Sequence, residues 1–389
     1  MPKTPSKTLH SDSSTLQLSF IAIYLASSVL AAYLVRIRPV INGQPIELEE
    51  NLAKGVLAVP GSAPIAIRQD YTGIEGIDVV LRTLVAAFIA GPARLEKRVW
   101  LQQFHFLLGF APMMGISVIE SSRACWKNSW AVRYTWTWGI LYQTVAGALA
   151  MPCYMISFIL ASRRTPLTMN STRSYLAAGQ DISAASARAT LPTTVLGYVA
   201  PTAAMYFYPW SNNNDIMAMI AVWMFTPMVL DLLMAIFQSA FSIFTEDAPA
   251  EPDAGRLSHL TPLYGYLAIV AGFSHIFTVY LISTSPDPAG LFLTAFIPDS
   301  TDALSSTIAG FHNIFQWDWL FVAAQQVLWA LYGVYELKVA GLTSMSPVLL
   351  TIAILVATVV AGPGGSLVLA WWWRETKLVE FEKQHLKEE

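Results

Sequence analysis

Charged residues are scarce in this chain of 389 residues: Asp, Glu, Lys and Arg make up only 13% of it. Soluble domains usually carry about 25%. Hydrophobic residues make up 54% of the sequence, and the mean hydropathy is +0.48. A single water-exposed domain cannot bury so much apolar surface. The composition therefore excludes an ordinary soluble protein.

Cysteine is almost absent, because Cys125 and Cys153 are the only two in the sequence. Two cysteines are too few for a disulfide framework or for a structural site built from several thiolates. A single bridge between them stays open, so the cysteine content does not indicate a redox compartment.

Motifs for metals and common cofactors are also missing. Enzymes that ionise a prenyl diphosphate need aspartate clusters to hold magnesium, and Asn214-Asp215 lacks the second acid of such a cluster. The six histidines show no HxxH or HExxH spacing, and no Walker loop is present. We therefore expect no metal and no cofactor. The enzyme classes that remain need only an acid, a base and a shaped apolar cavity.

The apolar residues come in blocks of the length that a helix needs to cross about 30 Å of hydrocarbon. They predict an all-α, polytopic integral membrane bundle with eight or nine transmembrane helices. The ninth depends on Ile77–Ala93, which is short and carries Asp78 and Arg82; its status decides which side the C-terminus faces. The predicted spans are Gln17–Val35, Ile77–Ala93, Trp100–Ile119, Thr135–Leu160, Ala189–Phe207, Ile216–Phe237, Leu263–Ile282, Trp319–Leu337 and Val348–Ala370.

One membrane domain, residues 17–373, is expected between a polar N-terminal tail (1–16) and a charged C-terminal tail (374–389). Lys and Arg distribute about equally over the two sides of a nine-span arrangement, so orientation stays open. The glycosylation sequon at Asn170 indicates a loop outside the cytoplasm, whereas the arginines of the same loop favour the cytoplasmic side. The short apolar run Leu291–Ile297 is interpreted as a loop packed on the domain, with a lid as the alternative.

Ionisable side chains inside spans are costly and are the first candidates for function. Asp78 and Arg82 stand four residues apart on one helix face, which predicts either a local ion pair or a proton donor tuned by the arginine. Asp231 follows Trp223 and Pro227 at spacings of four and is either a hydrogen-bonded structural residue or a second acid. Glu120 ends its predicted span, where we expect it to reach interfacial water.

The segment Trp317–Lys338 places a polar and aromatic stripe along one helical face. A lipid-facing helix would not carry such residues, so the stripe is expected to face protein or a cavity. Its ends lie about 27 Å apart at 1.5 Å per residue, so they cannot serve one small site. The stripe consists of Asp318, Gln325, Trp329, Tyr332 and Glu336.

His105 and His275 lie within predicted spans and are candidates for general bases, while His312 and Asn313 are assigned to a loop. The chain is rich in aromatics, and Trp371-Trp372-Trp373 before Arg374 is typical of an interfacial belt. Aromatic rings inside the bundle could stabilise a carbocation by cation–π attraction.

Three local patterns resemble fungal integral membrane terpene cyclases of ascofuranone-type meroterpenoid pathways. The resemblance runs from the second predicted span to the C-terminus. The patterns are Tyr71-Thr72-Gly73-Ile74 with Gly76-Ile77-Asp78 and Leu84-Val85-Ala86; Gln316-Trp317-Asp318; and Gly362-Pro363-Gly364-Gly365 followed by Trp373-Arg374-Glu375.

The resemblance implies a metal-independent cyclase that acts on a farnesylated aromatic polyketide whose terminal alkene is already an epoxide. A carboxylic acid of the enzyme would protonate the epoxide oxygen, and the opened chain would close an ether or a carbocycle. Asp78 and Asp318 lie in the matching motifs and are the acids carried over, with Asp231 as a further candidate. The substrate-binding candidates are Arg82, Gln325, Trp329, Tyr332 and Trp223. Burial would favour the protonated form that such an acid needs.

Two other classes of function remain open. A proton-coupled transporter would use the same intramembrane acids as relays, although no internal repeat is evident. A non-catalytic membrane scaffold of a biosynthetic pathway would use the stripe as a protein contact. The expected partners are a prenylated aryl epoxide, the lipid bilayer and neighbouring pathway enzymes, with no nucleic acid. The resemblance implies the endoplasmic reticulum as the location.

Overall fold

The computed structural model describes residues 7–164, 180, 182–244 and 254–385. Within these ranges the regular structure is almost entirely helical, which confirms the predicted helical class. The strands found there form one short antiparallel pair, β1 (Val56–Leu57) and β2 (Ile65–Ala66). The Asn170 sequon lies outside the described residues.

By length and composition, six helices in the described ranges are long and apolar enough to cross a membrane. Several are built from consecutive segments that a proline or a π-turn separates. They are α1 (Lys7–Ala31) with η1 (Ala32–Ile37) and α2 (Arg38–Ile41); α5 (Lys97–Gly109) with α6 (Ala111–Ser121); α13 (Asn213–Phe225) with η4 (Thr226–Val229) and α14 (Leu230–Ser242); α15 (Ala254–Ser283); α17 (Thr307–Val339); and α18 (Pro347–His385).

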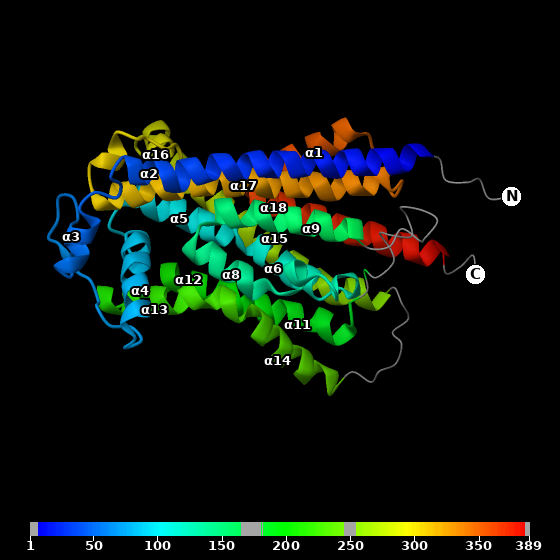
Figure 1. Ribbon diagram of the computed structural model, residues 1–389, viewed down its shortest axis with the longest axis horizontal. Helices are drawn as coiled ribbons and strands as arrows, with labels where there is room; N and C mark the ends of the chain where they lie inside the picture. Colours follow the sequence, from blue (N-terminus) through cyan, green and yellow to red (C-terminus); the bar gives the residue numbers. More distant parts are fainter. Residues whose placement is uncertain (1–6, 165–179, 181, 245–253, 386–389) are drawn as a thin grey trace.

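Two further helical segments run along the same bundle (Figure 1). The first is α8 (Thr135–Thr144) followed by α9 (Gly147–Arg164), and α9 packs on α1 and α17. The second is α11 (Ala184–Thr194), η3 (Val195–Val199) and α12 (Ala200–Phe207), and α11 packs on α14 and α15.

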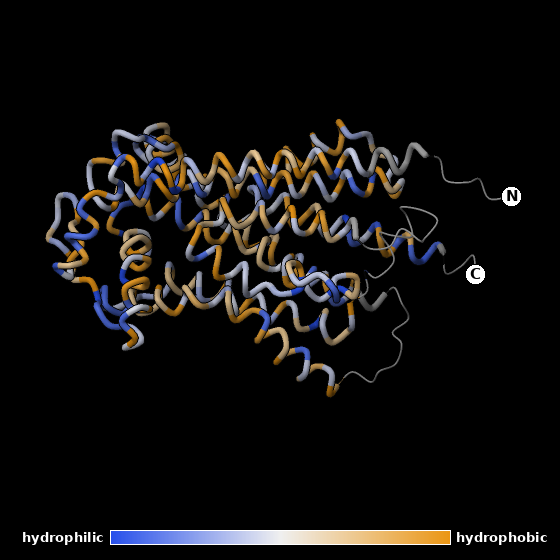
Figure 2. Tube along the Cα trace, in the orientation of Figure 1, coloured by the Kyte–Doolittle hydropathy of each residue, from blue (hydrophilic) through white to orange (hydrophobic). Residues whose placement is uncertain are grey.

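The outer surface of the bundle is apolar, as the hydropathy colouring in Figure 2 shows along the long helices. Val29, Ile269 and Val359 are 72%, 71% and 77% exposed on three different helices. Water would disfavour such a surface, whereas lipid chains would solvate it. The described bundle is therefore that of a membrane protein.

The helix α4 (Glu75–Phe88) lies across the direction of the other long helices (Figure 1). Its 14 residues reach only about 21 Å at 1.5 Å per residue, which is shorter than the hydrocarbon layer. The predicted span Ile77–Ala93 is thus a short transverse helix that closes one end of the bundle.

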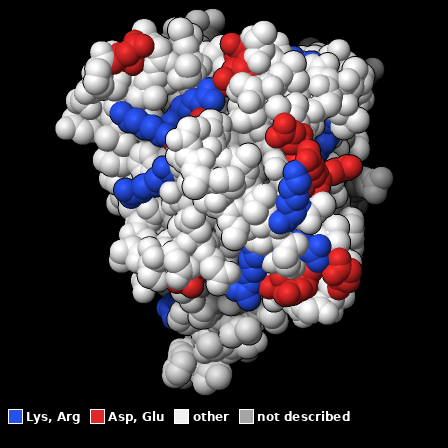
Figure 3. Space-filling model, turned by 90° about the vertical axis from the view of Figure 1, so that its left-hand side faces the viewer, with Lys and Arg blue, Asp and Glu red and all other residues white. Residues whose placement is uncertain are grey.

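The same end carries α3 (Leu48–Ala53), the β1–β2 pair, α16 (Pro288–Phe296) and η5 (Asp302–Leu304). Figure 3 shows charged side chains of both signs gathered over this end. The opposite end holds η2 (Ala124–Trp126), α7 (Trp130–Arg133), the start of α1 and the end of α18 (Figure 1).

Several predicted boundaries are wrong. The helix α17 begins at Thr307, where Ser306 accepts a hydrogen bond from the backbone N–H of Ala309, so His312 and Asn313 are helical. The run Leu291–Ile297 belongs largely to α16 and is therefore helical and not a loop, although it packs on α5 and α15 as expected. Helices also extend into both predicted tails, from Lys7 in α1 and to His385 in α18.

Candidate active site

The helix formed by α8 and α9 is broken at Val145 and Ala146. Ala146 has φ 114°, a conformation that strains any residue except glycine. Arg36 donates hydrogen bonds to the carbonyls of Thr144 (2.9 Å) and Val145 (2.8 Å) at the end of α8. A cation at a helix C-terminus stabilises both the open carbonyls and the helix dipole.

The other side of this break is held by an acid. Oδ1 of Asp318, on α17, accepts the backbone N–H of Ala148 in the first turn of α9 at 2.6 Å. A carboxyl group at a helix N-terminus has favourable electrostatics. Because lipid offers no hydrogen bonds, a broken helix at membrane depth needs such partners.

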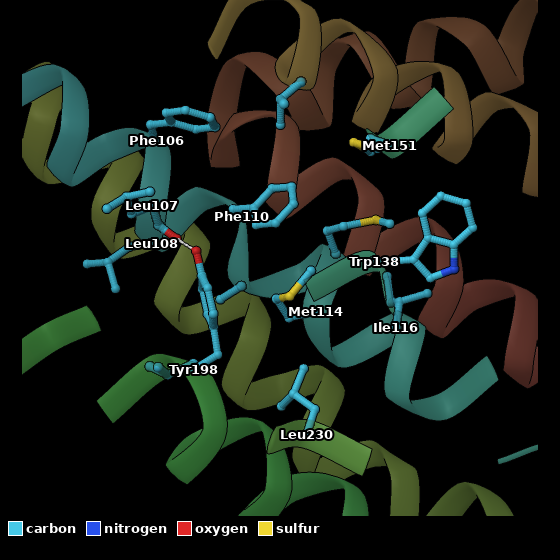
Figure 4. Packing of buried hydrophobic residues seen from close by; sticks show 14 of the residues in the cluster. Phe106, Leu107, Leu108, Phe110, Met114, Ile116, Trp138, Met151, Tyr198 and Leu230 are labelled. Carbon is cyan, nitrogen blue, oxygen red and sulfur yellow. Dashed lines mark hydrogen bonds between the residues drawn. The ribbon is translucent and has the colours of Figure 1, made fainter. Parts of the chain in front are cut away.

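A second break separates α5 from α6 at Phe110, just before Pro112, which has no backbone N–H to donate. The hydroxyl of Tyr198 donates to the carbonyl of Leu107 at 2.9 Å, and Gln326 donates to that of Gly109 at 3.0 Å. Figure 4 shows the Tyr198 side chain pointing to α5 beside Leu107 and Phe110.

A third break lies at Pro227, between α13 and α14. Trp223, one turn earlier, is 2% exposed and donates its indole N–H to the hydroxyl of Thr202 at 2.9 Å. The chain at Pro227 passes so close to Gly139 of α8 that a Cβ there would lie 2.6 Å from the Pro227 carbonyl oxygen. The close approach brings the broken part of α13–α14 against α8.

These three breaks border one cavity, which we call the aromatic cavity. The empty space among its side chains, including the mouth, is about 410 Å³, and only a small part of it is wide enough for a water molecule. The polar side chains of its lining residues carry one carboxyl, one amide, two phenols and one indole. It is lined by Phe88, Phe106, Leu107, Phe110, Tyr142, Gln143, Gly147, Tyr198, Trp223, Pro227, Phe315 and Asp318.

Two of the predicted site residues, Asp318 and Trp223, line this cavity together, although they come from α17 and α13. Asp318 is 7% exposed and is the cavity's one carboxyl among the lining residues. The rings of Phe88 and Phe315 form a T-shaped pair with 4.6 Å between their centroids, and the ring centroids of Phe88 and Trp223 are 5.2 Å apart. Asp318 and these aromatic rings therefore line the same cavity.

Asp231 lies elsewhere. It accepts hydrogen bonds from the hydroxyl of Thr135 (2.5 Å) and the backbone N–H of Trp136 (3.0 Å), so it caps the start of α8. It lines a separate, more open pocket with Arg133 and Ser186.

Asp78 and Arg82 are not paired with each other. The Asp78 carboxylate accepts the backbone N–H groups of Thr72 (2.8 Å) and Gly73 (3.0 Å) and the Thr72 hydroxyl (2.8 Å), whereas Arg82 bridges to Glu75 at 3.0 Å. Burial acts to raise the pKa of Asp78, but the three hydrogen bonds outweigh it and lower that pKa below its ordinary value. Asp78 thus holds the loop before α4 as a carboxylate.

The predicted stripe on α17 faces protein, as expected, but only its Asp318 lines the aromatic cavity. Gln325 donates to the Ser27 hydroxyl and the Ala148 carbonyl, both at 3.0 Å, and so ties α17 to α1 and α9. Trp329 packs on the ring of Trp371 at 4.5 Å.

The last turns of the stripe are also structural. Tyr332 meets the ring of Phe20 edge-on at 5.3 Å, and Glu336 forms an ion pair with Arg374 of α18 at 3.1 Å. These contacts join the ends of α1, α17 and α18, away from the cavity.

The expectation that Glu120 reaches interfacial water is wrong. It is fully buried and pairs with Arg123 (3.0 Å), which in turn pairs with Glu375 of α18 at 2.6 Å. Trp371 is 1% exposed and donates its indole N–H to Glu120 at 3.0 Å. Trp371 is therefore an interior residue, not part of a belt, because burying this carboxylate requires donors around it.

The two histidines form a directed hydrogen-bond chain. The indole N–H of Trp319 donates to Nδ1 of His105 (3.1 Å), Nε2 of His105 faces Nδ1 of His275 (3.1 Å), and Nε2 of His275 faces the Val359 carbonyl (3.0 Å). An indole only donates and a carbonyl only accepts, so we assign both imidazoles as neutral with the proton on Nε2. Pro363 has no N–H for the Val359 carbonyl, and His275 replaces it. Both ring lone pairs are occupied, which disfavours the predicted role as bases.

The glycines of the Gly362-Pro363-Gly364-Gly365 motif lie in α18 beside the histidine chain and permit a bend and a close helix contact there. Gly362 has φ 78° and interrupts α18, and a Cβ on Gly364 would lie 2.2 Å from the Gly109 carbonyl oxygen. The motif lets α18 bend and approach the broken part of α5.

Sequence reasoning missed most of the cavity wall. Pro112 and Pro227 were visible signals of helix breaks. At the break between α8 and α9 the visible signal was Gly147, but the positive φ falls on Ala146, the residue before it. The described residues contain no group of three or more His, Cys, Asp or Glu side chains that could hold a metal ion.

Comparison with known proteins gives a family model and three relatives. The CtvD domain model matches residues 20–379. Terpene cyclase ascI of Acremonium egyptiacum is 24% identical over 322 residues, which cover 81% of each chain. Terpene cyclase atmA of Aspergillus flavus is 23% identical over 320 residues, 79% of this chain and 83% of that protein. The FAD-dependent monooxygenase verC1 of Penicillium polonicum is 25% identical over 198 residues, 51% of this chain but 23% of that protein. No solved structure matches.

Proposed function

This chain belongs to the CtvD domain family, and from that premise we propose that it is a membrane-bound terpene cyclase of meroterpenoid biosynthesis. Two relatives that match about four fifths of the chain carry the name terpene cyclase, which supports the class of activity. The observation that carries the proposal is the aromatic cavity with Asp318 as the one carboxyl on its wall.

The proposed reaction is the acid-catalysed opening of a terminal epoxide on a farnesylated aromatic polyketide. Asp318 gives its proton to the epoxide oxygen while the bond from that oxygen to the tertiary carbon breaks. The cationic carbon is then captured by a hydroxyl group, giving a cyclic ether, or by an alkene, giving a carbocycle. The proton released in the last step returns to the Asp318 carboxylate. The net reaction is an isomerisation and consumes no cofactor.

The walls of the cavity suit this chemistry. Phe88, Trp223 and Phe315 line the cavity, and the π face of an aromatic ring attracts a cation. A wall with few polar groups also keeps water from capturing the cation before the ring closes. Because little of the empty space admits even water, a farnesyl chain enters only when these aromatic side chains rearrange.

An epoxide substrate is supported by the relative verC1, which is named as an FAD-dependent monooxygenase and shares a matching segment over 23% of its length. Flavin monooxygenases insert one oxygen atom from O₂. Insertion into a terminal alkene gives the epoxide that a cyclase then opens. The two activities would therefore act in succession, with a neighbouring pathway enzyme supplying the epoxide.

Asp318 is the best of the three acid candidates. Asp78 is held as a carboxylate by three donors, so it has no proton to give near neutral pH. Asp231 lines a different pocket and caps α8. Asp318 is buried and faces the cavity, which favours a protonated acid.

We also propose eight membrane crossings. The six long apolar helices are joined by the α8–α9 pair and by the α11–α12 segment, which run along the bundle (Figure 1). An even number agrees with the start of α1 and the end of α18, which lie at one end of the bundle (Figure 1). We place the protein in the endoplasmic reticulum membrane, where lipophilic pathway intermediates would partition.

The test is an assay of membranes that contain the protein, solubilised in mild detergent with EDTA and an epoxyfarnesyl aryl substrate. We expect a cyclic isomer of unchanged mass, identified by NMR and absent from control membranes. Intact epoxide after prolonged incubation with folded protein would count against the proposal.

A proton-coupled carrier is the second candidate, and the broken helices favour it because carriers bind substrates at such breaks. The two candidates differ in detergent, where no proton gradient exists. A cyclase still forms product there, whereas a carrier leaves the substrate unchanged.

A further inference from the structure

Tyr142 contributes a polar atom to the aromatic cavity that the protein leaves unsatisfied. Its ring lines the cavity, and its hydroxyl oxygen is buried without a hydrogen-bond partner among the described residues. A buried donor without a partner is costly, and proteins rarely keep one without a reason. The hydroxyl is therefore available to a bound molecule.

Tyr198, the other phenol of the same cavity, behaves differently. Its hydroxyl donates to the Leu107 carbonyl at 2.9 Å and repairs the break between α5 and α6 (Figure 4). The two tyrosines therefore line one cavity but differ in role, since Tyr198 supports the fold whereas the Tyr142 hydroxyl has no partner among the described residues.

The ring of Tyr142 is firmly placed. It lies in the last turn of α8 and meets Phe110 edge-on at 5.2 Å. Two residues later the α8 carbonyls are fixed by Arg36, and the Asp318 carboxyl caps the following helix. The unpartnered hydroxyl therefore belongs to the α8 side of this break, the proposed acid reaches the α9 side from α17, and both residues line one cavity.

We propose that the Tyr142 hydroxyl donates a hydrogen bond to the epoxide oxygen that Asp318 protonates. The inference rests on the proposed function and assigns a second group to the same reacting atom. The proton that forms the product hydroxyl comes from Asp318, while Tyr142 keeps its own proton and stabilises the charge that develops on oxygen. The site thus selects a substrate with an oxygen function at its reacting end over the corresponding alkene.

The first experiment compares three Tyr→Phe variants, each of which removes only a hydroxyl. Tyr142→Phe is expected to lower the rate of product formation about 10- to 100-fold, with the melting temperature unchanged because no internal hydrogen bond is lost. Tyr24→Phe is the matched control, since its hydroxyl is also buried and unpartnered among the described residues but lies outside the cavity. It should leave both quantities unchanged. Tyr198→Phe should lower the melting temperature.

Wild-type turnover from Tyr142→Phe, in a preparation where Asp318→Asn is inactive, would overturn the inference and leave the proposed function standing. A loss of turnover accompanied by a fall in melting temperature as large as that of Tyr198→Phe would also count against it, because the hydroxyl would then be structural.

The second experiment measures binding, so that it reports on Tyr142 even if no turnover occurs. The probes are the epoxyfarnesyl aryl compound and the same compound with its terminal alkene intact, bound to detergent-solubilised Asp318→Asn protein. One hydrogen bond should make the epoxide bind about 5-fold more tightly than the alkene. Tyr142→Phe should lower that preference, because the amide introduced by Asp318→Asn then remains as a donor in the cavity, whereas Tyr24→Phe should keep it. Equal binding of the two probes to the Asp318→Asn protein that retains Tyr142 would refute the inference.

Discussion

The Oδ1 atom of Asp318 lies 2.6 Å from the backbone nitrogen of Ala148, so the acid that faces the aromatic cavity also caps the first turn of α9. One side chain therefore connects the chemistry of the cavity to the stability of a broken membrane helix. The two roles can be separated by substitution, because capping needs only an oxygen acceptor whereas epoxide opening needs a proton donor.

Asp318→Asn keeps an oxygen that can accept the Ala148 N–H but removes the acid. We expect product formation to fall by at least about 100-fold, the usual contribution of a general acid, with little change in melting temperature. Asp318→Ala also loses the cap, which should lower the free energy of unfolding by about 1 kcal/mol. Turnover assays and thermal unfolding in detergent measure the two effects, and an active Asp318→Asn variant would assign the acid elsewhere.

Arg36→Met should destabilise the protein, because the carbonyls of Thr144 and Val145 lose their donors where lipid cannot replace them. The expected loss is about 1–3 kcal/mol in the free energy of unfolding. Lys54→Met is the control, since the Lys54–Glu50 pair is exposed and should contribute only about 0–1 kcal/mol. Equal effects of the two substitutions in denaturant titrations would contradict the assigned role of Arg36.

His105 and His275 should be coupled, since they are links of one hydrogen-bond chain. We expect His275→Phe to cost about 1–3 kcal/mol by leaving the Val359 carbonyl unsatisfied. The double variant His105→Phe/His275→Phe should differ from the sum of the single effects by at least about 0.5 kcal/mol in a double-mutant cycle. Strict additivity would mean that the two imidazoles do not share a bond.

Asp78 should affect the pH dependence of stability but not the pH optimum of the reaction. Its pKa is lowered in the folded state, so its contribution is present above the unfolded pKa of about 3.9 and is lost as the pH falls through the lower folded value. Asp78→Asn should be less stable than wild type at pH 7, and the difference should shrink below about pH 4. A constant difference across that range would show that the charge of Asp78 does not matter.

Both termini should lie on the same side of the membrane, because α1 begins and α18 ends at one end of the bundle (Figure 1). Tags at the two ends should therefore show the same accessibility to protease in sealed microsomes. Opposite accessibility would require an odd number of crossings and would restore α4 as a span.

Much of the architecture could be predicted because hydrophobic blocks of membrane length leave few other structures to a chain. The transverse α4 was the main exception: its apolar residues resemble a short span, but they cover one end of the bundle. The predicted span began at Trp319, whereas α17 begins at Thr307. His312 and Asn313 look like loop residues, yet they are helical and bond to Ala295 and Asp299 from neighbouring segments.

By itself, the sequence determined that the chain is a helical membrane protein, that its described polar stripe faces inward, and that Asp318 and Trp223 are among its candidate site residues. Only the tertiary structure decided which of those residues meet. Asp318 and Ala148 stand 170 positions apart, and Arg36 and Val145 stand 109 apart, so no local pattern records either bond. Helix breaks expose backbone groups whose partners come from other helices, and the three-dimensional packing of those helices placed the breaks around one cavity.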